Sequence, residues 1–528
     1  MRGAGIRRAV CLVRRSRLSI ESAGSTQEDR VNEYKLFINN KWVPSASGET
    51  FTTSCPASGE VLASFHCATD KDVDAACNAA RAAFRSGVWS RMENNERARI
   101  MLRAADLMAD RWEELSRMEA LDTGKPIHEV KTGDMPYSIS AFRYFANLAR
   151  EIKGEYIHVP NEPYMHDYLV YEPFGVVAVV APYNFPLHLL TRSLAPALAA
   201  GNTTICKASS MTPWTTAVLG EIVEEAGFPP GVVNIVAGPG SSVGEWLVSH
   251  REVDVVAFTG SEKVGRRLLE LSSASPIIKK NVLELGGKGP VIVEPDCNFE
   301  YTVKGVADGL LLNSGQVCCA QTRLILNRQI YDRFLEALVS ELKSRVPGDI
   351  LDPSTRLGAM INVKQLEEVD RIVQAAVSAG ATLLCGGKRI TTHPFDRGAF
   401  YEPTVLAGVK TDMFCYTEEI FGPVLVVVGY DDIDEAIDLA NDSQYGLGAG
   451  IFSESHKTLH YASQRLNAGS IFVNMPNTAR MNAPFGGNRN SGIGREYGSA
   501  GLHEYLRSKN TIWNMAFGHP EEERAIYF

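Results

Sequence analysis

Short β-branched runs alternate with helical segments through much of this chain, and few folds accommodate such an alternation. Residues 176–180 read Val-Val-Ala-Val-Val, which is typical of a strand buried on both faces. Strands that alternate with helices favour right-handed crossovers and a parallel, doubly wound sheet, which binds ligands at the carboxyl ends of its strands. The pattern predicts further strands at 203–206, 232–236 and 253–258, and helices at 96–119, 189–200, 214–226 and from Lys263 onward.

The same alternation repeats in the second half of the chain. A length of 528 residues is too great for one simple core and favours two or three lobes. The change of lobe is expected near Lys288, and a cleft between lobes is the expected place for chemistry. Beyond it, the pattern predicts strands at 290–293, 324–326, 424–428 and 448–452, and helices at 300–312 and 331–346.

Two adjacent thiols stand out in the second lobe. Residues 311–323 read LLNSGQVCCAQTR, and Cys318 and Cys319 follow a turn-like Asn-Ser-Gly. Glu284, in LELGGK, lies on the other side of the lobe boundary. A thiol and a carboxylate that meet across a cleft form a nucleophile and a base. The alternative is that both cysteines are small buried hydrophobes, as most free cysteines are.

Two further segments have features of a binding site. Asn184 lies between Pro182 and Pro186, where its amide could donate a hydrogen bond to an oxyanion, although a plain turn asparagine is the alternative. Gly260, Ser261 and Gly265 follow a strand and open a helix, an arrangement that lets backbone approach a pyrophosphate. The glycine-rich segment 238–244 misses the dinucleotide-binding spacing by one residue and is interpreted as a loop.

Composition excludes several classes of function. A net charge of −9 argues against a general nucleic-acid binder, because phosphate neutralisation needs a basic surface. No apolar run reaches the roughly 18 residues that a membrane span needs. The ten cysteines show no paired Cys or His spacing typical of zinc, so no metal site is expected, and reduced thiols are the favoured interpretation.

With these elements in this order, the chain resembles the NAD(P)-dependent aldehyde dehydrogenase superfamily over roughly residues 34–515. The motifs that carry the resemblance are APYNFP, KASSMTP, FTGS with Gly265, LELGGK, GQVC, EEIFGP and PFGGNRNSGIGRE. The resemblance implies an α/β fold with two doubly wound parallel-sheet lobes and a small β oligomerisation arm. The implied activity is the oxidation of an aldehyde to a carboxylic acid with NAD or NADP.

The resemblance also implies a role for individual residues. Cys318 would be the nucleophile, Asn184 the side chain of the oxyanion hole, and Glu284 the general base that activates the deacylating water. A helix expected after Cys318 would favour the thiolate, and Glu284 is expected to be shielded from water by its apolar neighbours. Asn474 would lie near the substrate entrance. The implied cofactor site comprises Pro182, Lys207, Ser210, Gly260, Ser261, Gly265, Glu419 and Phe421.

Two positions depart from the family pattern. Ser210 stands where strongly NAD-preferring relatives have glutamate, so the repulsion of a 2′-phosphate is gone and NADP is expected to be tolerated. Arg192 stands where many relatives have tryptophan. It could bind the carboxylate tail of an acidic aldehyde, or it could pair structurally with an acid. Leu312 occupies the position of the second arginine that such a carboxylate clamp needs.

The resemblance divides the chain into domains. Residues 34–152 and 175–286 would form the dinucleotide-binding domain, 287–495 the catalytic domain, and 153–174 with 500–516 the oligomerisation arm of a homodimer or homotetramer. Residues 1–33 are interpreted as a basic extension outside the fold. Their arginines favour either a mitochondrial presequence or a simple basic tail, so the expected location is cytoplasmic, with the mitochondrial matrix as the alternative.

A cysteine-nucleophile hydrolase or esterase is the competing function. It would need a histidine base, and the sequence places no histidine near Cys318. Steady formation of reduced nicotinamide would separate the two activities.

Overall fold

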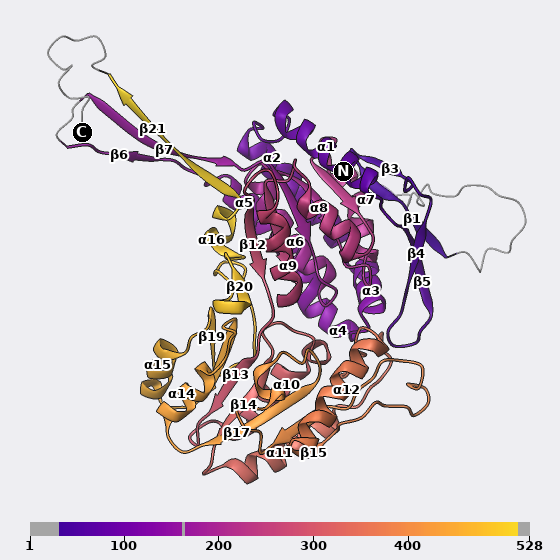
Figure 1. Cartoon of the computed structure of the whole chain (residues 1–528), viewed down its shortest axis with the longest axis vertical. Coiled ribbons are helices and arrows are strands. Elements are labelled where there is room, and N and C mark those ends of the chain that lie inside the picture. Colours follow the sequence, from indigo (N-terminus) through magenta and orange to yellow (C-terminus); the bar gives the residue numbers. More distant parts are fainter. Residues whose placement is uncertain (1–30, 161–163, 516–528) are drawn as a thin grey trace, which may run out of the picture.

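The computed structural model describes residues 31–160 and 164–515, which form two lobes and a projecting arm (Figure 1). The first lobe is built on an eight-stranded sheet. Its five central strands are parallel, and antiparallel strands close both edges. In spatial order they are β20 (Gly492–Ile493), β12 (Lys280–Glu284), β11 (Val255–Thr259), β8 (Val176–Val180), β9 (Thr203–Lys207), β10 (Val233–Val236), β2 (Leu36–Ile38) and β3 (Lys41–Val43).

Helices cover both faces of this sheet, so the expected doubly wound arrangement is confirmed. Alternate residues of each central strand pack against opposite helix layers, as the two-residue period of a strand requires. One face packs against α2 (Asn94–Asp110), α5 (Met135–Ala149), α6 (Pro186–Ala199) and α7 (Trp214–Ala226). The other face packs against α1 (Asp70–Ser86), α8 (Glu245–Ser249) and α9 (Glu262–Ser273).

The second lobe repeats this architecture around a seven-stranded sheet. Its strands, in spatial order, are β15 (Thr382–Cys385), β16 (Thr404–Ala407), β17 (Val424–Tyr430), β14 (Gln321–Asn327), β13 (Gly289–Val293), β18 (Gly448–Phe452) and β19 (Ser470–Val473). Helices α10 (Phe299–Leu311) and α11 (Tyr331–Ser344) cover one face. The other face is covered by α12 (Val363–Ser378), α14 (Ile433–Asn441) and α15 (His456–Arg465).

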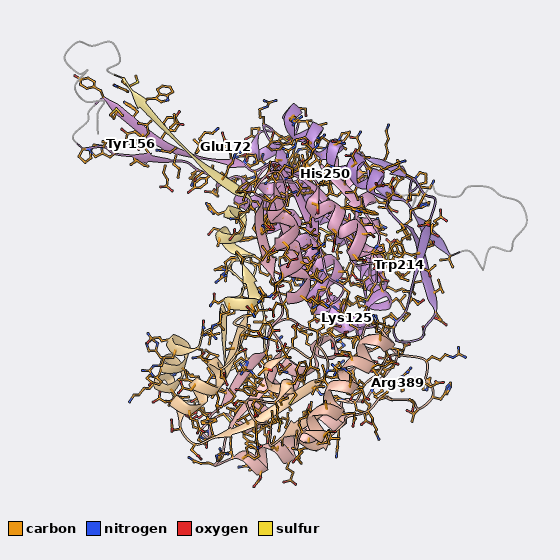
Figure 2. All side chains as sticks on the ribbon, in the orientation of Figure 1. Lys125, Tyr156, Glu172, Trp214, His250 and Arg389 are labelled. Atoms are coloured by element: carbon orange, nitrogen blue, oxygen red, sulfur yellow. The ribbon has the colours of Figure 1, made fainter. Side chains whose placement is uncertain are left out.

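Two small sheets complete the molecule, of which the first described below is antiparallel and the second is mixed. The arm, which extends away from the first lobe (Figure 1), contains β21 (Leu506–Asn514), β7 (Met165–Pro173) and β6 (Glu155–Ile157). Figure 2 places Tyr156 on this arm and Lys125 where the two lobes meet. The other sheet contains β1 (Asn32–Tyr34), β5 (Val61–His66) and β4 (Thr50–Ser54). The remaining short helices are α4 (Ile127–Glu129), α13 (Phe414–Thr417) and α16 (Gly498–His503).

Three local predictions were wrong. The helix expected over 96–119 is two helices, α2 and α3 (Trp112–Thr123), because Arg111 leaves helical geometry and binds Glu221 on α7 at 2.8 Å. The segment 238–244 is not a loop, since Gly240–Gly244 forms a π-helical turn that leads into α8. The fold also begins earlier than residue 34, because β1 starts at Asn32 and pairs with β5. The basic residues 1–30 lie outside the described part of the chain.

None of the helices in the described ranges is long and apolar enough to cross a membrane. The nine cysteines within those ranges are all free thiols.

Candidate active site

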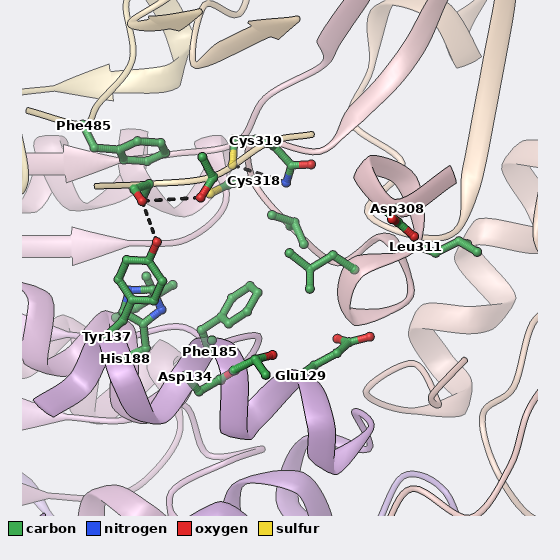
Figure 3. A pocket seen from close by; sticks show the side chains of 18 of the residues that line it. Glu129, Asp134, Tyr137, Phe185, His188, Asp308, Leu311, Cys318, Cys319 and Phe485 are labelled. Atoms are coloured by element: carbon green, nitrogen blue, oxygen red, sulfur yellow. Dashed lines mark hydrogen bonds between the residues drawn. The ribbon is translucent and has the colours of Figure 1, made fainter. Parts of the chain in front are cut away.

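A cavity of about 570 Å³ lies between the two lobes and reaches both adjacent thiols (Figure 3). Its deeper wall is largely aromatic, with Tyr137, Phe185, Phe485 and Tyr497 among the lining residues. Polar side chains at other lining positions include His128, Asp308, Arg345 and Arg356. The cavity is therefore large enough for a small organic molecule and presents it to a sulfur nucleophile.

Cys318 is placed by a tight turn directly before the central strand β14. The preceding residues Asn313 and Ser314 have positive φ angles of 49° and 54°, which turn the chain sharply after α10. The segment that links the two sheets passes against this turn, because a Cβ added to Gly287 would lie only 2.5 Å from the Cys318 carbonyl oxygen. Only glycine fits there, so the backbone of the Glu284 segment closely approaches that of Cys318.

Glu284 ends β12, the last parallel strand before the chain crosses to the second lobe. It pairs in register with Thr259 on β11, and its side chain is 2% exposed, so the expected shielding from water is present. Its Oε2 accepts a hydrogen bond from Arg192 Nη2 at 3.0 Å. The structure thus brings the predicted base and the predicted nucleophile to facing edges of the two sheets.

The expected activation of the thiol by a following helix is wrong, because Cys318 is followed by a turn and then by strand β14. The adjacent Cys319 thiol, burial and the Glu284 carboxylate raise the pKa of Cys318, and Arg192 acts in the opposite direction. The thiol is therefore protonated at neutral pH in this state, and a nearby group has to accept its proton before attack.

Asn184 is held beside the cysteine turn by hydrogen bonds at both its side chain and its backbone. Its Nδ2 donates to the Gln316 carbonyl at 3.0 Å, and the side chain is buried. Its carbonyl oxygen accepts from Lys125 Nζ at 2.8 Å and from Asn313 Nδ2 at 3.0 Å. The amide of Asn184 is thus fixed close to the turn that carries Cys318.

Sequence reasoning missed the buried lysine that supports this asparagine. Lys125 also binds Asp134 Oδ1 at 2.8 Å, and its ammonium lies 3.7 Å from the centre of the Phe185 ring. Both charged side chains are essentially inaccessible, at 0% and 1%. The sequence signal was slight: a lysine between Gly124 and Pro126, where no exposed helical face accounts for the charge.

Arg192 shows which of its two predicted roles the fold favours. Its Nη2 donates to Thr259 Oγ1 at 2.7 Å as well as to Glu284, and its side chain is 2% exposed. The structural pairing with an acid is therefore present, and the acid is the predicted general base. Leu312 lines the same cavity and supplies no second cation for a substrate carboxylate.

The predicted pyrophosphate segment has the shape that close backbone approach requires. Ser261 caps α9 by accepting from the Val264 N–H at 3.4 Å. A Cβ at Gly260 would collide with the Phe258 ring, and one at Gly265 would lie 2.6 Å from Leu285. Packing within the lobe therefore requires both glycines, and the phosphate contact at the exposed N-terminus of α9 stays a prediction.

Lys207 is the last residue of β9, and Ser210 follows that strand. The neighbouring strand β8 leads to Pro182. Lys207 Nζ is buried and donates to the Ala208 carbonyl at 2.8 Å, and burial lowers its pKa to about 8. Ser210 lines a second, open cavity of about 520 Å³ together with Glu49, Cys67 and Pro239.

Glu419 and Phe421 approach from the second lobe. Glu419 Oε1 accepts from the Gly287 N–H at 3.0 Å, and burial raises the pKa of Glu419 to about 7. Phe421 has a positive φ of 55° and its ring meets Tyr183 edge-on at 5.9 Å. Both predicted cofactor residues thus lie beside the crossing between the sheets, next to the Glu284 segment.

Two further expectations concern the cavity wall. Asn474 does not line the cavity, because its side chain bonds the backbone of Ser453, and Asn477 lines the wall instead. His188, which lies on α6 four residues before Arg192, also lines the cavity. Its ring stacks on Tyr137 at 4.9 Å and bonds the Tyr497 hydroxyl, and burial lowers its pKa, so it is a neutral part of the wall.

Comparisons with known proteins agree with this geometry. The model of the aldehyde dehydrogenase family matches residues 42–511. DhaS of Bacillus subtilis, whose name assigns it to the aldehyde dehydrogenases, is 42% identical over 481 residues, covering 91% of this chain and 96% of that protein. Aldehyde dehydrogenase family 2 member B4 of Arabidopsis thaliana, a mitochondrial protein by its name, is 40% identical, covering 92% of this chain and 88% of its own length.

A solved structure extends the likeness to three dimensions. Betaine aldehyde dehydrogenase from Staphylococcus aureus, crystallised in complex with NAD+, superposes with a TM-score of 0.89 at 37% identity. The match covers 91% of this chain and 97% of that one. Together with the family match across most of the chain and the shared two-lobed fold, this shows that the chain belongs to the aldehyde dehydrogenase family, whose members oxidise aldehydes with NAD(P)+.

Proposed function

We propose that Cys318, Asn184 and Glu284 are the catalytic residues with which this chain oxidises an aldehyde to a carboxylic acid. The observation that supports this best is their convergence from three separate segments. Asn184 bonds the carbonyl two residues before Cys318, and the Glu284 segment packs against the Cys318 carbonyl. Arg192, which binds Glu284, lines the same cavity as the thiol.

In the proposed reaction the Cys318 thiol gives its proton to solvent water in the cavity, and the sulfur then attacks the aldehyde carbon. A sulfur–carbon bond forms, and the carbonyl electrons move to oxygen, where Asn184 Nδ2 and the Cys318 backbone N–H stabilise the negative charge. NAD(P)+, when bound, accepts the hydride that leaves this carbon. A thioester to Cys318 remains, and Glu284 removes a proton from the water that hydrolyses it.

We propose that the cofactor is held by eight residues from both lobes, which are Pro182, Lys207, Ser210, Gly260, Ser261, Gly265, Glu419 and Phe421. We propose that NADP is accepted as well as NAD, because Ser210 offers a hydroxyl and no charge to a 2′-phosphate. Glu49 lines the same cavity as Ser210. Its negative charge would act against the binding of a 2′-phosphate, as the glutamate of NAD-preferring relatives does. Comparing kcat/KM for the two cofactors tests the proposal, and a strict preference for NAD would contradict it.

The proposed substrate is an aldehyde with a flat or branched apolar body and an uncharged tail. The aromatic wall of the cavity favours such a body. An acidic tail near the thiol is not favoured, because Arg192 is already neutralised by Glu284. The names of relatives do not narrow the choice, since they include betaine aldehyde, indole-3-acetaldehyde and retinal dehydrogenases.

A panel of aromatic, aliphatic and acidic aldehydes, assayed by formation of reduced nicotinamide, tests the activity. Steady formation with the wild type and none with Cys318→Ala would support the assignment. Ester hydrolysis that proceeds equally well without nicotinamide, with no reaction of any aldehyde, would favour the competing cysteine hydrolase. Activity that persists in Cys318→Ala would show that another residue is the nucleophile.

The arm is proposed to mediate a homodimer or homotetramer. Its strands carry large exposed apolar side chains, which isolated monomers rarely display together. Light scattering during gel filtration would give the mass, and a monomer at micromolar concentration would contradict the proposal. The exposed side chains are Tyr156 (61%), Ile157 (42%), Ile512 (58%), Trp513 (53%) and Met515 (55%).

A cytoplasmic location is proposed, with the mitochondrial matrix as the alternative. The arginines of residues 2–17 are compatible with either, and three of the similar proteins carry mitochondrial names. Fluorescent fusions of the full chain and of a chain starting at Val31 would distinguish them. Import of the full chain alone would contradict the cytoplasmic assignment.

A further inference from the structure

Arg192 links the predicted general base to a helix that has no other catalytic residue. It lies in the middle of α6, and its guanidinium reaches across to the ends of β11 and β12. Both Arg192 and Glu284 are 2% exposed, so water screens their attraction very little. The pair therefore fixes the direction of the Glu284 carboxylate far more firmly than a surface ion pair would.

The contacts of the guanidinium define which oxygen of Glu284 is held. Nη2 donates both to Glu284 Oε2 at 3.0 Å and to Thr259 Oγ1 at 2.7 Å. Thr259 and Glu284 lie side by side in the register of β11 and β12. Arg192 is thus braced by one strand while it holds a carboxylate oxygen on the next.

The other oxygen of Glu284 is buried and has no hydrogen-bond partner among the described residues, and the same is true of Arg192 Nε. Buried carboxylate oxygens are nearly always satisfied by a donor, which is often an ordered water. Arg192 and Cys318 both line the 570 Å³ cavity, and Glu284 adjoins this lining through its contact with Arg192.

Arg192 also influences the nucleophile electrostatically. The Glu284 carboxylate contributes to the raised pKa of Cys318, whereas Arg192 opposes it. The carboxylates of Glu284 and Glu496 outweigh the cost of burying Arg192 and raise its pKa, so its charge is permanent. A fixed positive charge between the base and the thiol reduces their mutual repulsion.

We propose that Arg192 is a positioning residue, which holds Glu284 through Oε2 and leaves Oε1 to receive the proton of the deacylating water. This inference rests on the proposed roles of Cys318 and Glu284. In the step, Oε1 takes one proton from water, and the water oxygen bonds to the thioester carbon. The carbon–sulfur bond then breaks, its electron pair returns to the Cys318 sulfur, and the carboxylic acid leaves.

Rapid-mixing kinetics with Arg192→Met separates this role from a structural one. The enzyme is mixed with NAD+ and a neutral aromatic aldehyde, and reduced nicotinamide is followed through the first turnover and the steady state. We expect the steady-state rate to fall by roughly tenfold or more and the first-turnover rate to fall by less than about threefold, because Arg192 bonds the base directly but affects the thiol only through its charge. The acyl group should then accumulate on Cys318, as intact-protein mass spectrometry would detect.

Three companion variants sharpen the result. Arg192→Lys should recover part of the steady-state rate, because it restores the positive charge but not the planar geometry of the guanidinium group. Thr259→Val should lower the steady-state rate relative to the first-turnover rate in the same way but to a smaller extent, since it removes only the hydrogen bond from Arg192 to Thr259. Arg97→Met is the matched control, because Arg97 is also buried (4%) but binds Trp89 O and Asn94 Oδ1. Its loss should lower stability without changing the ratio of the two rates.

The double variant Arg192→Met, Glu284→Gln should be no slower in the steady state than Glu284→Gln alone, because both changes act on one step. The proposal would be overturned if Arg192→Met or Arg192→Lys slowed both phases equally, or if the loss appeared only as a raised KM for an acidic aldehyde such as succinic semialdehyde. If Arg192→Met did not fold, the Arg192→Lys and Thr259→Val variants would decide by the same criterion. Formation of reduced nicotinamide by Cys318→Ala would instead contradict the underlying function.

Discussion

Two buried ion pairs lie beneath the active-site cavity, and they differ in what their charges do. In the first lobe, Lys125 and Asp134 form a pair in which the lysine ammonium also binds the Asn184 carbonyl and the face of Phe185. In the second pair, Arg192 binds Glu284 while one oxygen of Glu284 stays unpartnered. Each pair leaves one buried carboxylate oxygen without a hydrogen-bond partner among the described residues, Asp134 Oδ2 and Glu284 Oε1. The pairs differ in their cations, because the Lys125 ammonium is engaged by protein groups, whereas Arg192 Nε has no partner there.

The difference indicates two kinds of support. A cation with all its donors engaged fixes a backbone, and here that backbone carries the Asn184 amide. The arginine instead holds a carboxylate that is itself the proposed general base. We therefore expect damage to the lysine pair to affect stability and the first chemical step, and damage to the arginine pair to affect deacylation.

Removal of the lysine should have the largest effect on the free energy of unfolding. Lys125→Met leaves Asp134 buried without a cation, and breaking such a pair costs about 3–5 kcal/mol. Acylation should slow as well, since Asn184 loses a backbone anchor. Chemical denaturation and first-turnover kinetics would measure both. The matched control is Lys131→Met, whose partner Glu113 is 78% exposed, and it should change stability little.

Truncation of the asparagine tests what the lysine pair supports. Asn184→Ala removes one donor to the oxyanion, which costs about 2.7–4 kcal/mol, or roughly a 10²–10³-fold loss of rate. The loss should appear in the first turnover, unlike that of Arg192→Met. An Asn184→Ala enzyme with a normal first turnover would remove the distinction between the two pairs.

The surroundings of the lysine pair are expected to respond to pH. Burial raises the pKa of Glu129, which lies beside the lysine pair and accepts from the Asn313 N–H at 2.8 Å, to about 7. A raised folded-state pKa gives stability that is complete below the unfolded value of roughly 4.5 and is lost as pH rises through about 7. Relative to Glu129→Gln, the wild type should therefore lose on the order of 2–3 kcal/mol between pH 5 and pH 8.

Thermal or chemical unfolding of both proteins across that range checks the sign. If the stability difference between wild type and Glu129→Gln stayed constant, or grew in favour of the wild type at high pH, burial would not be the controlling effect.

The smallest expected effect lies at the far end of the cofactor site, away from both pairs. Glu49→Gln should raise kcat/KM for NADP relative to NAD by a few-fold, because an exposed carboxylate repels a 2′-phosphate only weakly through water. Neither the first-turnover nor the steady-state rate with saturating NAD should change. A shift in those rates would mean that Glu49 acts on more than the cofactor.

The sequence predicted the sheets well and the supporting contacts poorly, for physical reasons. Runs such as 176–180 are buried on both faces, so their composition alone indicates strands. The helix break at Arg111 leaves no trace in the sequence because the apolar spacing continues on both sides of it. The contact between Arg192 and Glu284 spans 92 positions and depends on how α6 lies over β11 and β12.

The thiol environment was the clearest error at the site itself. A helix after Cys318 was expected, but strand β14 begins three residues later. The charges that control the thiol come from α6 and β12 in the other lobe, and their distance from the sulfur is set by lobe packing. Residue types at the site were thus readable from motifs, whereas their electrostatics were not.

The most direct test of the account is a single-turnover experiment with Glu284→Gln. When this variant is mixed with NAD+ and an accepted aldehyde, it should form about one equivalent of reduced nicotinamide per active site and then nearly stop. Mass spectrometry of the quenched protein should locate the acyl group on Cys318. The absence of a burst, continued turnover at the wild-type rate, or acylation of Cys319 in place of Cys318 would contradict the central claim.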